Sequence, residues 1–361
     1  MAAQENRIYD EVMDYVQRPF EAGFEPLALK VFSHQFARNP TYRKYCEAKD
    51  RTPDTVASWR EIPAVPTEAF KEVDFACGRP EKTFLTSGTS QGPAKRGRHP
   101  VPCLEVYRAS ALLNFSAHLL PDLSDLRMII LTGSPEIWPR SSLAHMMEMV
   151  RQEYGGEDAA YYINDTGLDI DRLLRTLTEA CEHDKPVILL GITLAFHEVL
   201  EYTQTHRLRF HLPGGSRIMD TGGFKGHRID LSKTDLYRRY EEVMGIPRTH
   251  IVNEYGMTEM CSQFYDTVLT DHLNGIACPR HKRIPPWVRT LIVHPETLEE
   301  LPPGQTGLLR HYDLANCGSV MALQTEDIGH AVSDGFEITG RAAGAESRGC
   351  SLIVEELRRA R

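Results

Sequence analysis

The sequence predicts an α/β fold in which helices flank a mainly parallel sheet and a β-rich subregion follows. Two observations support this fold class. From residue 127 onward, short apolar runs ending in Gly, Ser, Thr or Pro alternate with longer stretches of helical periodicity. After about residue 285 the helical rhythm gives way to Pro, Gly and short β-like runs. Strand-helix alternation is the pattern of a parallel sheet covered by helices.

The predicted elements follow one another along the chain. Apolar residues recur at helical spacing through residues 6–48, which predicts a helical N-terminal segment. Strand-like runs occupy 128–133, 187–191, 217–222 and 251–256, and the helix-like stretches are 141–152, 169–183, 194–206 and 232–244. The β-like runs of the last part are 288–293, 307–312 and 319–324. In an open parallel sheet, ligands bind beyond the carboxyl ends of the strands, so we expect the site there.

Composition narrows the class of protein. The chain has 361 residues, of which 41% are hydrophobic and 25% charged, as in an ordinary globular protein. Its net charge of -9 disfavours broad affinity for nucleic acid or anionic lipid. No stretch reaches the roughly 20 apolar residues that span a bilayer, and the N-terminus lacks an apolar signal core. Eight scattered cysteines indicate a reducing compartment, so we expect a cytoplasmic protein.

A hydroxyl-rich loop follows a short apolar run at 83–93. Its hydroxyls and glycines are those of Thr86, Ser87, Gly88, Thr89, Ser90 and Gly92, and Lys95, Arg96, Arg98 and His99 follow. Glycine lets backbone N-H groups approach a phosphate, hydroxyls donate to its oxygens and cations offset its charge. The spacing matches neither a Walker loop nor GxGxxG. An ordinary polar loop with a basic tail is the alternative.

Three further segments carry nucleotide-binding chemistry. The segment 253–259 combines a ring that can stack on a base, a hydroxyl for a phosphate and carboxylates for Mg²⁺. Its candidate residues are Asn253, Glu254, Tyr255, Gly256, Thr258 and Glu259. Asp327 can accept from ribose hydroxyls, and Arg341 offers a guanidinium for ribose or phosphate. The alternatives are a core aromatic residue at Tyr255 and a turn or helix cap at Asp327.

In this order, SGTSQG, EYGMTE, TEDIG and GR resemble the motifs of the adenylate-forming superfamily, which includes acyl-CoA synthetases and phenylacetate-CoA ligase. Within it, the chain is similar to acyl-protein synthetases of the LuxE type. The residues that carry this likeness are Asp220-Thr-Gly-Gly-Phe-Lys-Gly226, Pro285-Pro-Trp287, Ser141-Ser-Leu143 and Glu346-Ser-Arg-Gly-Cys-Ser351. The resemblance covers about residue 60 to the end and implies the large N-terminal domain of an adenylate-forming enzyme.

The resemblance also implies roles for individual residues. Ser87, Gly88, Thr89 and Ser90 would hold the phosphates of ATP, Tyr255 would face adenine, Thr258 the α-phosphate, Glu259 the Mg²⁺ and Asp327 the ribose, while Gly222 and Gly223 would line the crevice. The hydroxyl loop, the 255–259 turn and Asp327 are therefore expected to converge on one nucleotide.

The resemblance further implies a domain organisation. We expect a helical segment over 1–60, the adenylate-forming core over 61–345 and a tail over 346–361. The small mobile domain of the superfamily is expected to be absent or truncated. Its catalytic lysine has no candidate, because no lysine follows Lys282.

Cys350 is the candidate acyl acceptor. A thiolate attacks the electrophilic carbonyl of an acyl-adenylate, and Arg348 with the helical stretch after Cys350 would lower the thiol pKa. The LuxE type places its acceptor cysteine near the C-terminus, as Cys350 is placed; an inert cysteine is the alternative. Zinc binding by Cys278 and His281, with Cys261 and Cys317, is disfavoured because only one close pair exists.

The hypothesis is therefore ATP-dependent activation of a carboxylic acid to acyl-AMP, followed by transfer to a thiol. The resemblance implies a fatty acid, Cys350 as the thiol and an acyl reductase as partner. Two alternatives stay open: a ligase that delivers the acyl group to CoA or a carrier protein, and a non-catalytic nucleotide-binding subunit.

Overall fold

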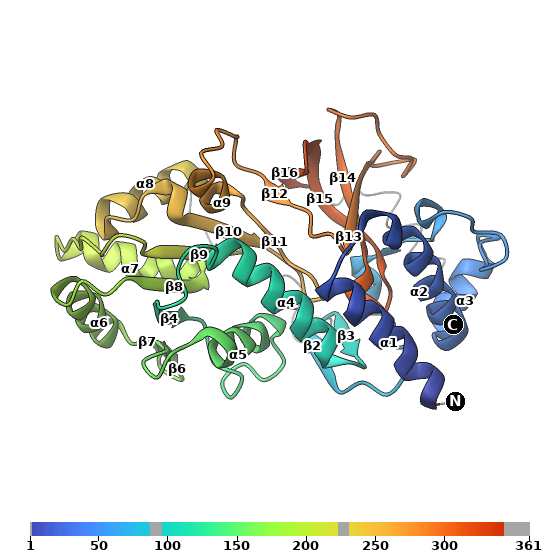
Figure 1. Ribbon diagram of the computed structural model, residues 1–361, viewed down its shortest axis with the longest axis horizontal. Coiled ribbons are helices and arrows are strands. Elements are labelled where there is room, and N and C mark those ends of the chain that lie inside the picture. The colour runs from blue at the N-terminus through green and yellow to red at the C-terminus, as the bar shows by residue number, and fades with distance from the viewer. Residues whose placement is uncertain (1, 87–95, 223–230, 343–361) are drawn as a thin grey trace. The chain divides into compact units, whose positions relative to one another are not determined.

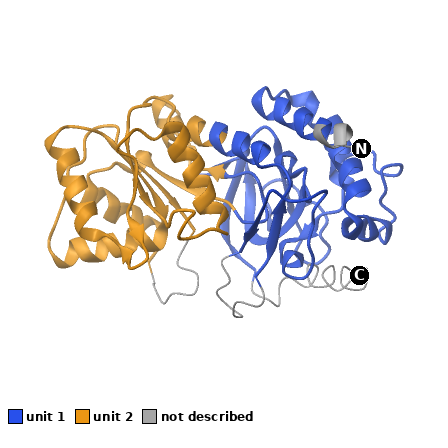
Figure 2. Cartoon of the chain, turned by 90° about the horizontal axis from the view of Figure 1, so that it is seen from below, with its two compact units in different colours: residues 1–113, 257–263, 281–361 blue, residues 114–256, 264–280 orange. Residues whose placement is uncertain are grey.

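The chain forms two compact units, shown in different colours in Figure 2. The computed structural model describes residues 2–86, 96–222 and 231–342, with side chains from Arg7 onward. Unit 1 comprises Met1–Leu113, Met257–Gln263 and His281–Arg361, and unit 2 comprises Asn114–Gly256 and Phe264–Arg280. Each unit therefore joins segments that are distant in the sequence. The domain boundaries expected near residues 60 and 345 stay predictions.

Unit 2 is a mainly parallel sheet with helices packed on it (Figure 1). Its strand order is β11-β10-β9-β8-β4-β5, and β11 alone in this order runs antiparallel to its neighbour. The elements are β4 Arg127–Leu131, α5 Ser142–Tyr154, β5 Ala160–Tyr161, β6 Ile163–Asn164, β7 Gly167–Leu168, α6 Ile170–Glu182, β8 Val187–Ile192, α7 Thr193–Thr205, β9 Arg217–Thr221, α8 Lys233–Met244, η5 Arg248–His250, β10 Ile251–Tyr255, β11 Phe264–Tyr265 and α9 Val268–Leu273. The predicted alternation of strands and helices is confirmed.

One buried apolar cluster joins this sheet to its helices. Alternate residues of a strand point to the same face, and Ile129 with Leu131, or Val187 with Leu189, face the cluster in this way. Helices α6, α7 and α8 contribute Leu173, Leu177, Phe196, Val199, Leu236 and Tyr240. Burying such side chains provides roughly 1.5–3 kcal/mol each, which is the main force that holds the helices on the sheet.

Capping residues set where the helices of unit 2 begin. The side chains of Ser141, Asp169 and Ser232 accept the N-H groups of Ala144, Arg172 and Asp235, at the N-termini of α5, α6 and α8. Such caps stabilise a helix by about 1 kcal/mol. The Ser141-Ser-Leu143 turn of the sequence is therefore a helix start.

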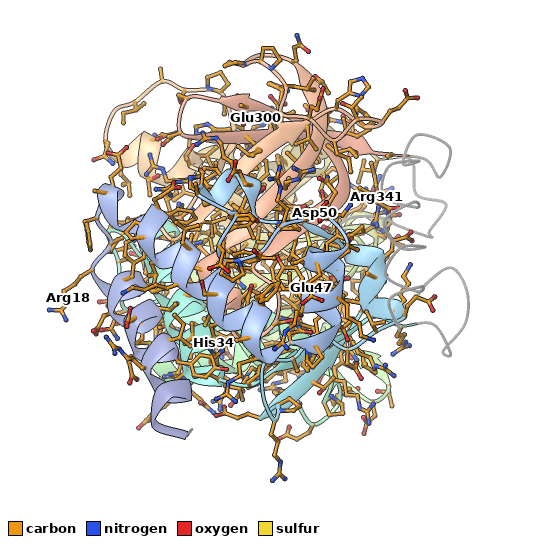
Figure 3. The ribbon with its side chains drawn as sticks, turned by 90° about the vertical axis from the view of Figure 1, so that its right-hand side faces the viewer. Arg18, His34, Glu47, Asp50, Glu300 and Arg341 are labelled. Carbon is orange, nitrogen blue, oxygen red and sulfur yellow. The ribbon has the colours of Figure 1, made fainter. Side chains whose placement is uncertain are left out.

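Unit 1 contains the β-rich subregion expected after residue 285. Its strand order is β12-β16-β15-β14-β13, all antiparallel, and β1 adds to β15 in parallel. The elements are β1 Val65–Pro66, β12 Lys282–Arg283, β13 Val288–Val293, β14 Thr306–Asp313, η6 Leu314–Asn316, β15 Ala322–Val332 and β16 Gly335–Arg341. Figure 3 labels Arg341, the last residue of β16.

The N-terminal helices of unit 1 are tied to its C-terminal part. The helices are α1 Ala2–Gln17, η1 Glu21–Gly23, α2 Phe24–Arg38, α3 Pro40–Glu47, η2 Trp59–Glu61 and η3 Thr67–Lys71, and a small hairpin follows from β2 Lys82–Leu85 and β3 Arg98–Val101. Buried Gln35 of α2 donates to the carbonyls of Asn316 (3.1 Å) and Cys317 (3.2 Å), and accepts from the Met321 N-H (3.2 Å).

Helix α4, Leu104–Leu119, contains the boundary between the units. Across the described ranges, none of the helices combines the length and apolar character that crossing a membrane requires.

Candidate active site

Glu259 lies in the 257–263 turn, which belongs to unit 1, and its carboxyl is buried. Burial raises the pKa of this carboxyl to about 7, against the lowering effect of the positive charges of Arg341 and Lys71, and the negative charge of Asp327 raises it further. These groups are close enough to influence the ionisation of Glu259. The structure therefore brings together three predicted residues, Glu259, Asp327 and Arg341, in one unit.

Two buried side chains hold the turn by its backbone. The ring of His99 contacts the Thr258 carbonyl through Nδ1 at 2.6 Å, and Asn316 donates to the Glu259 carbonyl at 2.9 Å. Burial lowers the pKa of His99 to about 4, so this ring is neutral at physiological pH and Nδ1 carries the donated proton. His99 thus supports the turn from within the fold.

Asp327 and Arg341 lie opposite each other on β15 and β16. Directly opposed residues of antiparallel strands place their Cβ atoms about 4.5–5.5 Å apart on one face. Arg341, about half exposed, donates to Glu326 at 2.8 Å through Nη2, and the Asp327 N-H donates to Thr325 Oγ1 at 3.1 Å. The β-hairpin therefore presents a carboxylate and a guanidinium side by side.

The two ends of the hydroxyl loop are joined in unit 1. The Thr86 N-H donates to the Gly97 carbonyl at 3.0 Å, and the Gly97 N-H donates to Thr86 Oγ1 at 2.9 Å. Thr86 thereby closes the stem of the loop. Ser87, Gly88, Thr89, Ser90 and Gly92 lie outside the described residues, so their phosphate-binding role stays a prediction.

In unit 2, polar side chains at the ends of β9 and β10 bind one another. Buried Asn253 donates to the carbonyl (3.1 Å) and carboxylate (3.0 Å) of Asp220, and the Thr221 hydroxyl donates to buried Glu254. The Asn253 N-H donates to Asp266 at 3.0 Å. Sequence reasoning missed Asp220 and Thr221 as partners, although both end a predicted strand, where such side chains collect.

The remaining predicted residues of unit 2 lie at the same strand ends. The ring of Tyr255 is half-buried, with its centroid 5.7 Å from that of Phe264, and Gly256 follows it. Gly222 follows β9 with φ +80°, a left-handed conformation that favours glycine. Gly223 lies outside the described residues.

The cysteines in the described residues are free thiols, and Cys350 lies outside this part of the chain. Cys261 and Cys317 are buried in unit 1, and burial raises the pKa of both well above its usual range. His281 Nε2 lies 2.7 Å from Asp334 Oδ1. Within the described residues, no group of three or more His, Cys, Asp or Glu side chains is arranged to hold a metal ion.

A mainly parallel α/β unit combined with an antiparallel sheet is the fold of the adenylate-forming enzymes. The structure of 2-hydroxyisobutyryl-CoA ligase in an open conformation, in complex with 2-HIB-AMP and CoA, matches with a TM-score of 0.63 at 14% identity, over 87% of this chain and 73% of that chain. ATP-bound MatB from Rhodopseudomonas palustris matches with a TM-score of 0.52 at 17% identity, over 73% of this chain and 49% of that chain. This chain thus aligns with about half the length of MatB.

The family model for acyl-protein synthetase, LuxE, matches residues 16–358, and the chain belongs to this family. The expected resemblance is confirmed, and the protein is an acyl-protein synthetase, a carboxylate ligase. The long-chain-fatty-acid–luciferin-component ligase of Aliivibrio fischeri is 22% identical over 331 residues, which cover 87% of this chain and 82% of that protein.

Proposed function

We propose that this chain activates a long-chain fatty acid with ATP and transfers the acyl group to its own Cys350, for delivery to an acyl reductase. One observation carries the proposal: the buried Glu259 carboxyl lies near Asp327 and Arg341 of the same unit, and the charges of these two side chains affect its pKa. The relative from Aliivibrio fischeri, named for a long-chain fatty acid, supports the substrate class.

The first half-reaction is adenylation. A carboxylate oxygen of the acid attacks the α-phosphorus of ATP, the bond to the pyrophosphate oxygen breaks, and acyl-AMP and pyrophosphate form. Thr258 contacts the α-phosphate, Asp327 accepts from the ribose hydroxyls and Tyr255 faces adenine. Positioning and neutralisation of charge supply most of the catalysis.

The residues present fit Mg²⁺ as the accompanying ion. A divalent cation stabilises the ionised form of Glu259, whose pKa burial raises to about 7. Proteins bind Mg²⁺ through one or two carboxylates together with substrate phosphates, so a single buried carboxylate is sufficient here. When bound, the ion supplies charge that offsets the phosphates.

The second half-reaction is thioester formation. The thiolate of Cys350 attacks the acyl carbonyl carbon, the bond to the AMP oxygen breaks, and AMP leaves with its electron pair. The product is an S-acyl protein whose thioester is suited to a reductase that consumes activated acyl groups.

Two measurements test the proposal. Wild-type protein is expected to catalyse ATP-pyrophosphate exchange that depends on an added long-chain fatty acid. The absence of exchange with every carboxylic acid tested would reject adenylation. Labelled fatty acid with ATP is expected to label the protein itself, and Cys350→Ser should abolish this label while exchange continues. Cys278→Ser, at an exposed cysteine, is the matched control and should leave labelling intact. Label found only on added CoA would refute the transfer to Cys350.

A further inference from the structure

The end of η3, Phe70 and Lys71, lies beside two parts of the site in unit 1. The ring of buried Phe70 is 5.8 Å from that of His99, edge to face, and His99 contacts the Thr258 carbonyl at 2.6 Å. Phe70 therefore packs against the residue that supports the turn of Glu259.

Phe70 also lies against the stem of the hydroxyl loop. A Cβ atom built on Gly97 would be 3.5 Å from the Cβ of Phe70 and 3.0 Å from the Thr86 side chain. Gly97 and Thr86 are the residues whose hydrogen bonds close that loop. Lys71 therefore follows a residue that packs against both the loop stem and His99, the side chain that supports the Glu259 turn.

The backbone of this segment is fixed to the sheet that carries Asp327. Strand β1 pairs with β15 through Val65↔Leu323 and Pro66↔Gln324, and η3 follows β1 directly. The N-H of Glu72 donates to the Ala69 carbonyl at 3.0 Å, which continues the turn past Lys71. The position of Lys71 relative to Asp327 is thus set by strand pairing and by the burial of Phe70.

Among the residues that the structure describes, the ammonium group of Lys71 forms a weak ion pair with Glu68, which a ligand can replace. Its Nζ lies 3.1 Å from Glu68, three residues earlier, and both side chains are 39% exposed. Exposed pairs of this kind contribute about 0–1 kcal/mol. Lys71 and Arg341 are positive charges near the buried Glu259 carboxyl. Arg341 has a partner of its own in Glu326, at 2.8 Å.

We propose that Lys71 is a phosphate-binding residue of the adenylation reaction, whose ammonium group contacts the β- and γ-phosphates of ATP and stabilises pyrophosphate as it leaves. The inference rests on the proposed function. The negative charge of the triphosphate exceeds what one exposed carboxylate offers, so the ammonium group exchanges Glu68 for the phosphates when ATP binds. Lys71 then acts on the leaving group, and Thr258 on the α-phosphate.

The test compares Lys71→Met with Lys71→Arg in fatty-acid-dependent ATP-pyrophosphate exchange. A lost charge-assisted hydrogen bond corresponds to about a 10-fold or greater loss. We expect Lys71→Met to lower exchange by this factor and to raise the half-saturating pyrophosphate concentration, while inhibition by AMP, which lacks these phosphates, keeps its affinity. Lys71→Arg should recover most of the activity.

Two controls separate a ligand contact from a structural role. Glu68→Gln removes the ion pair and keeps the cation, so exchange should stay within about twofold of wild type, as for a weak surface pair. Lys30→Met removes another exposed lysine paired with a carboxylate, Glu11 at 2.6 Å, and should have no effect. If Lys71→Met weakens the affinity for AMP as much as that for pyrophosphate, or if its exchange activity is normal, the proposed role of Lys71 is wrong. Absence of exchange in the wild type would instead reject the proposed function.

Discussion

In unit 2 the polar side chains at the strand ends bind one another, whereas in unit 1 the charged side chains around Glu259 are positioned by backbone contacts and separate partners. Asn253 and Glu254 are buried and bonded to Asp220 and Thr221. Glu259, by contrast, is held through its carbonyl, by Asn316. One sequence motif, 253–259, therefore contains residues that stabilise unit 2 and a residue, Glu259, that belongs to the site in unit 1. These residues should respond differently to substitution.

The largest expected effect is that of Glu259→Gln on adenylation. Glu259 is proposed to hold Mg²⁺, and losing the carboxylate that holds the ion is expected to lower the rate by about 100-fold or more, because the charge of the phosphates is then less well offset. Stability should be unchanged or slightly higher, because burial disfavours the ionised carboxylate and raises its pKa to about 7.

Exchange assays and urea unfolding on the same preparation measure both effects. Glu47→Gln, at an exposed glutamate of unit 1 labelled in Figure 3, is the control and should change neither property. If Glu259→Gln keeps full exchange activity, the assignment of Glu259 to the site is wrong.

Asn253→Ala should lower the stability of the protein more than its adenylation activity, the opposite of Glu259→Gln. The substitution removes two hydrogen bonds to buried Asp220, and we expect a loss of about 1–3 kcal/mol in the free energy of unfolding. Urea unfolding followed by circular dichroism measures the change. Asn274→Ala, at an exposed asparagine of the same unit that donates to the Thr270 carbonyl at 2.7 Å, should cost less than about 0.5 kcal/mol. Equal effects of the two variants would contradict a structural role for Asn253.

Gly222→Ala should have the smallest effect of the series. With φ at +80° an alanine is strained, although within the described part of the chain a Cβ atom would meet no neighbour closer than 4 Å. The expected cost is about 1 kcal/mol, seen as a lower midpoint of thermal unfolding. Gly214→Ala is the matched control, because its surroundings are equally open and its φ lies outside the left-handed region. A larger loss of exchange activity than of stability would assign Gly222 a role in ligand binding rather than a structural role.

Much of the fold could be predicted from the sequence because its strand-helix alternation is regular. The runs at 187–191, 217–222 and 251–256 match β8, β9 and β10 within about a residue. Helix α4 was not predicted, because its apolar residues are not confined to one face: Leu112 is buried and Leu113 is exposed. The hairpin of β15 and β16 extends beyond Gln324 through charged residues and glycines, which do not resemble a strand.

The site was predictable only where its residues form motifs. Glu259, Asp327 and Arg341 lie in recognisable segments, and the structure groups them. Lys71 belongs to no motif, and its place depends on the pairing of β1 with β15, a contact between distant parts of the chain. His99 follows the hydroxyl loop in the sequence, and its burial and its contact with Thr258 make it a support of the turn.

The parallel pairing of Val65 with Leu323 also bears on how this protein is synthesised. Unit 2 is mostly one continuous segment and can fold while the ribosome is still translating the rest. Strand β1 and the helices before it can pack only after β15 has been synthesised, and Gln35 can form its hydrogen bond only after Met321 has been synthesised. Loop closure over such a separation slows folding and leaves apolar helix faces exposed in the nascent chain. During translation the apolar faces of this N-terminal segment are therefore covered last, when β15 has been made.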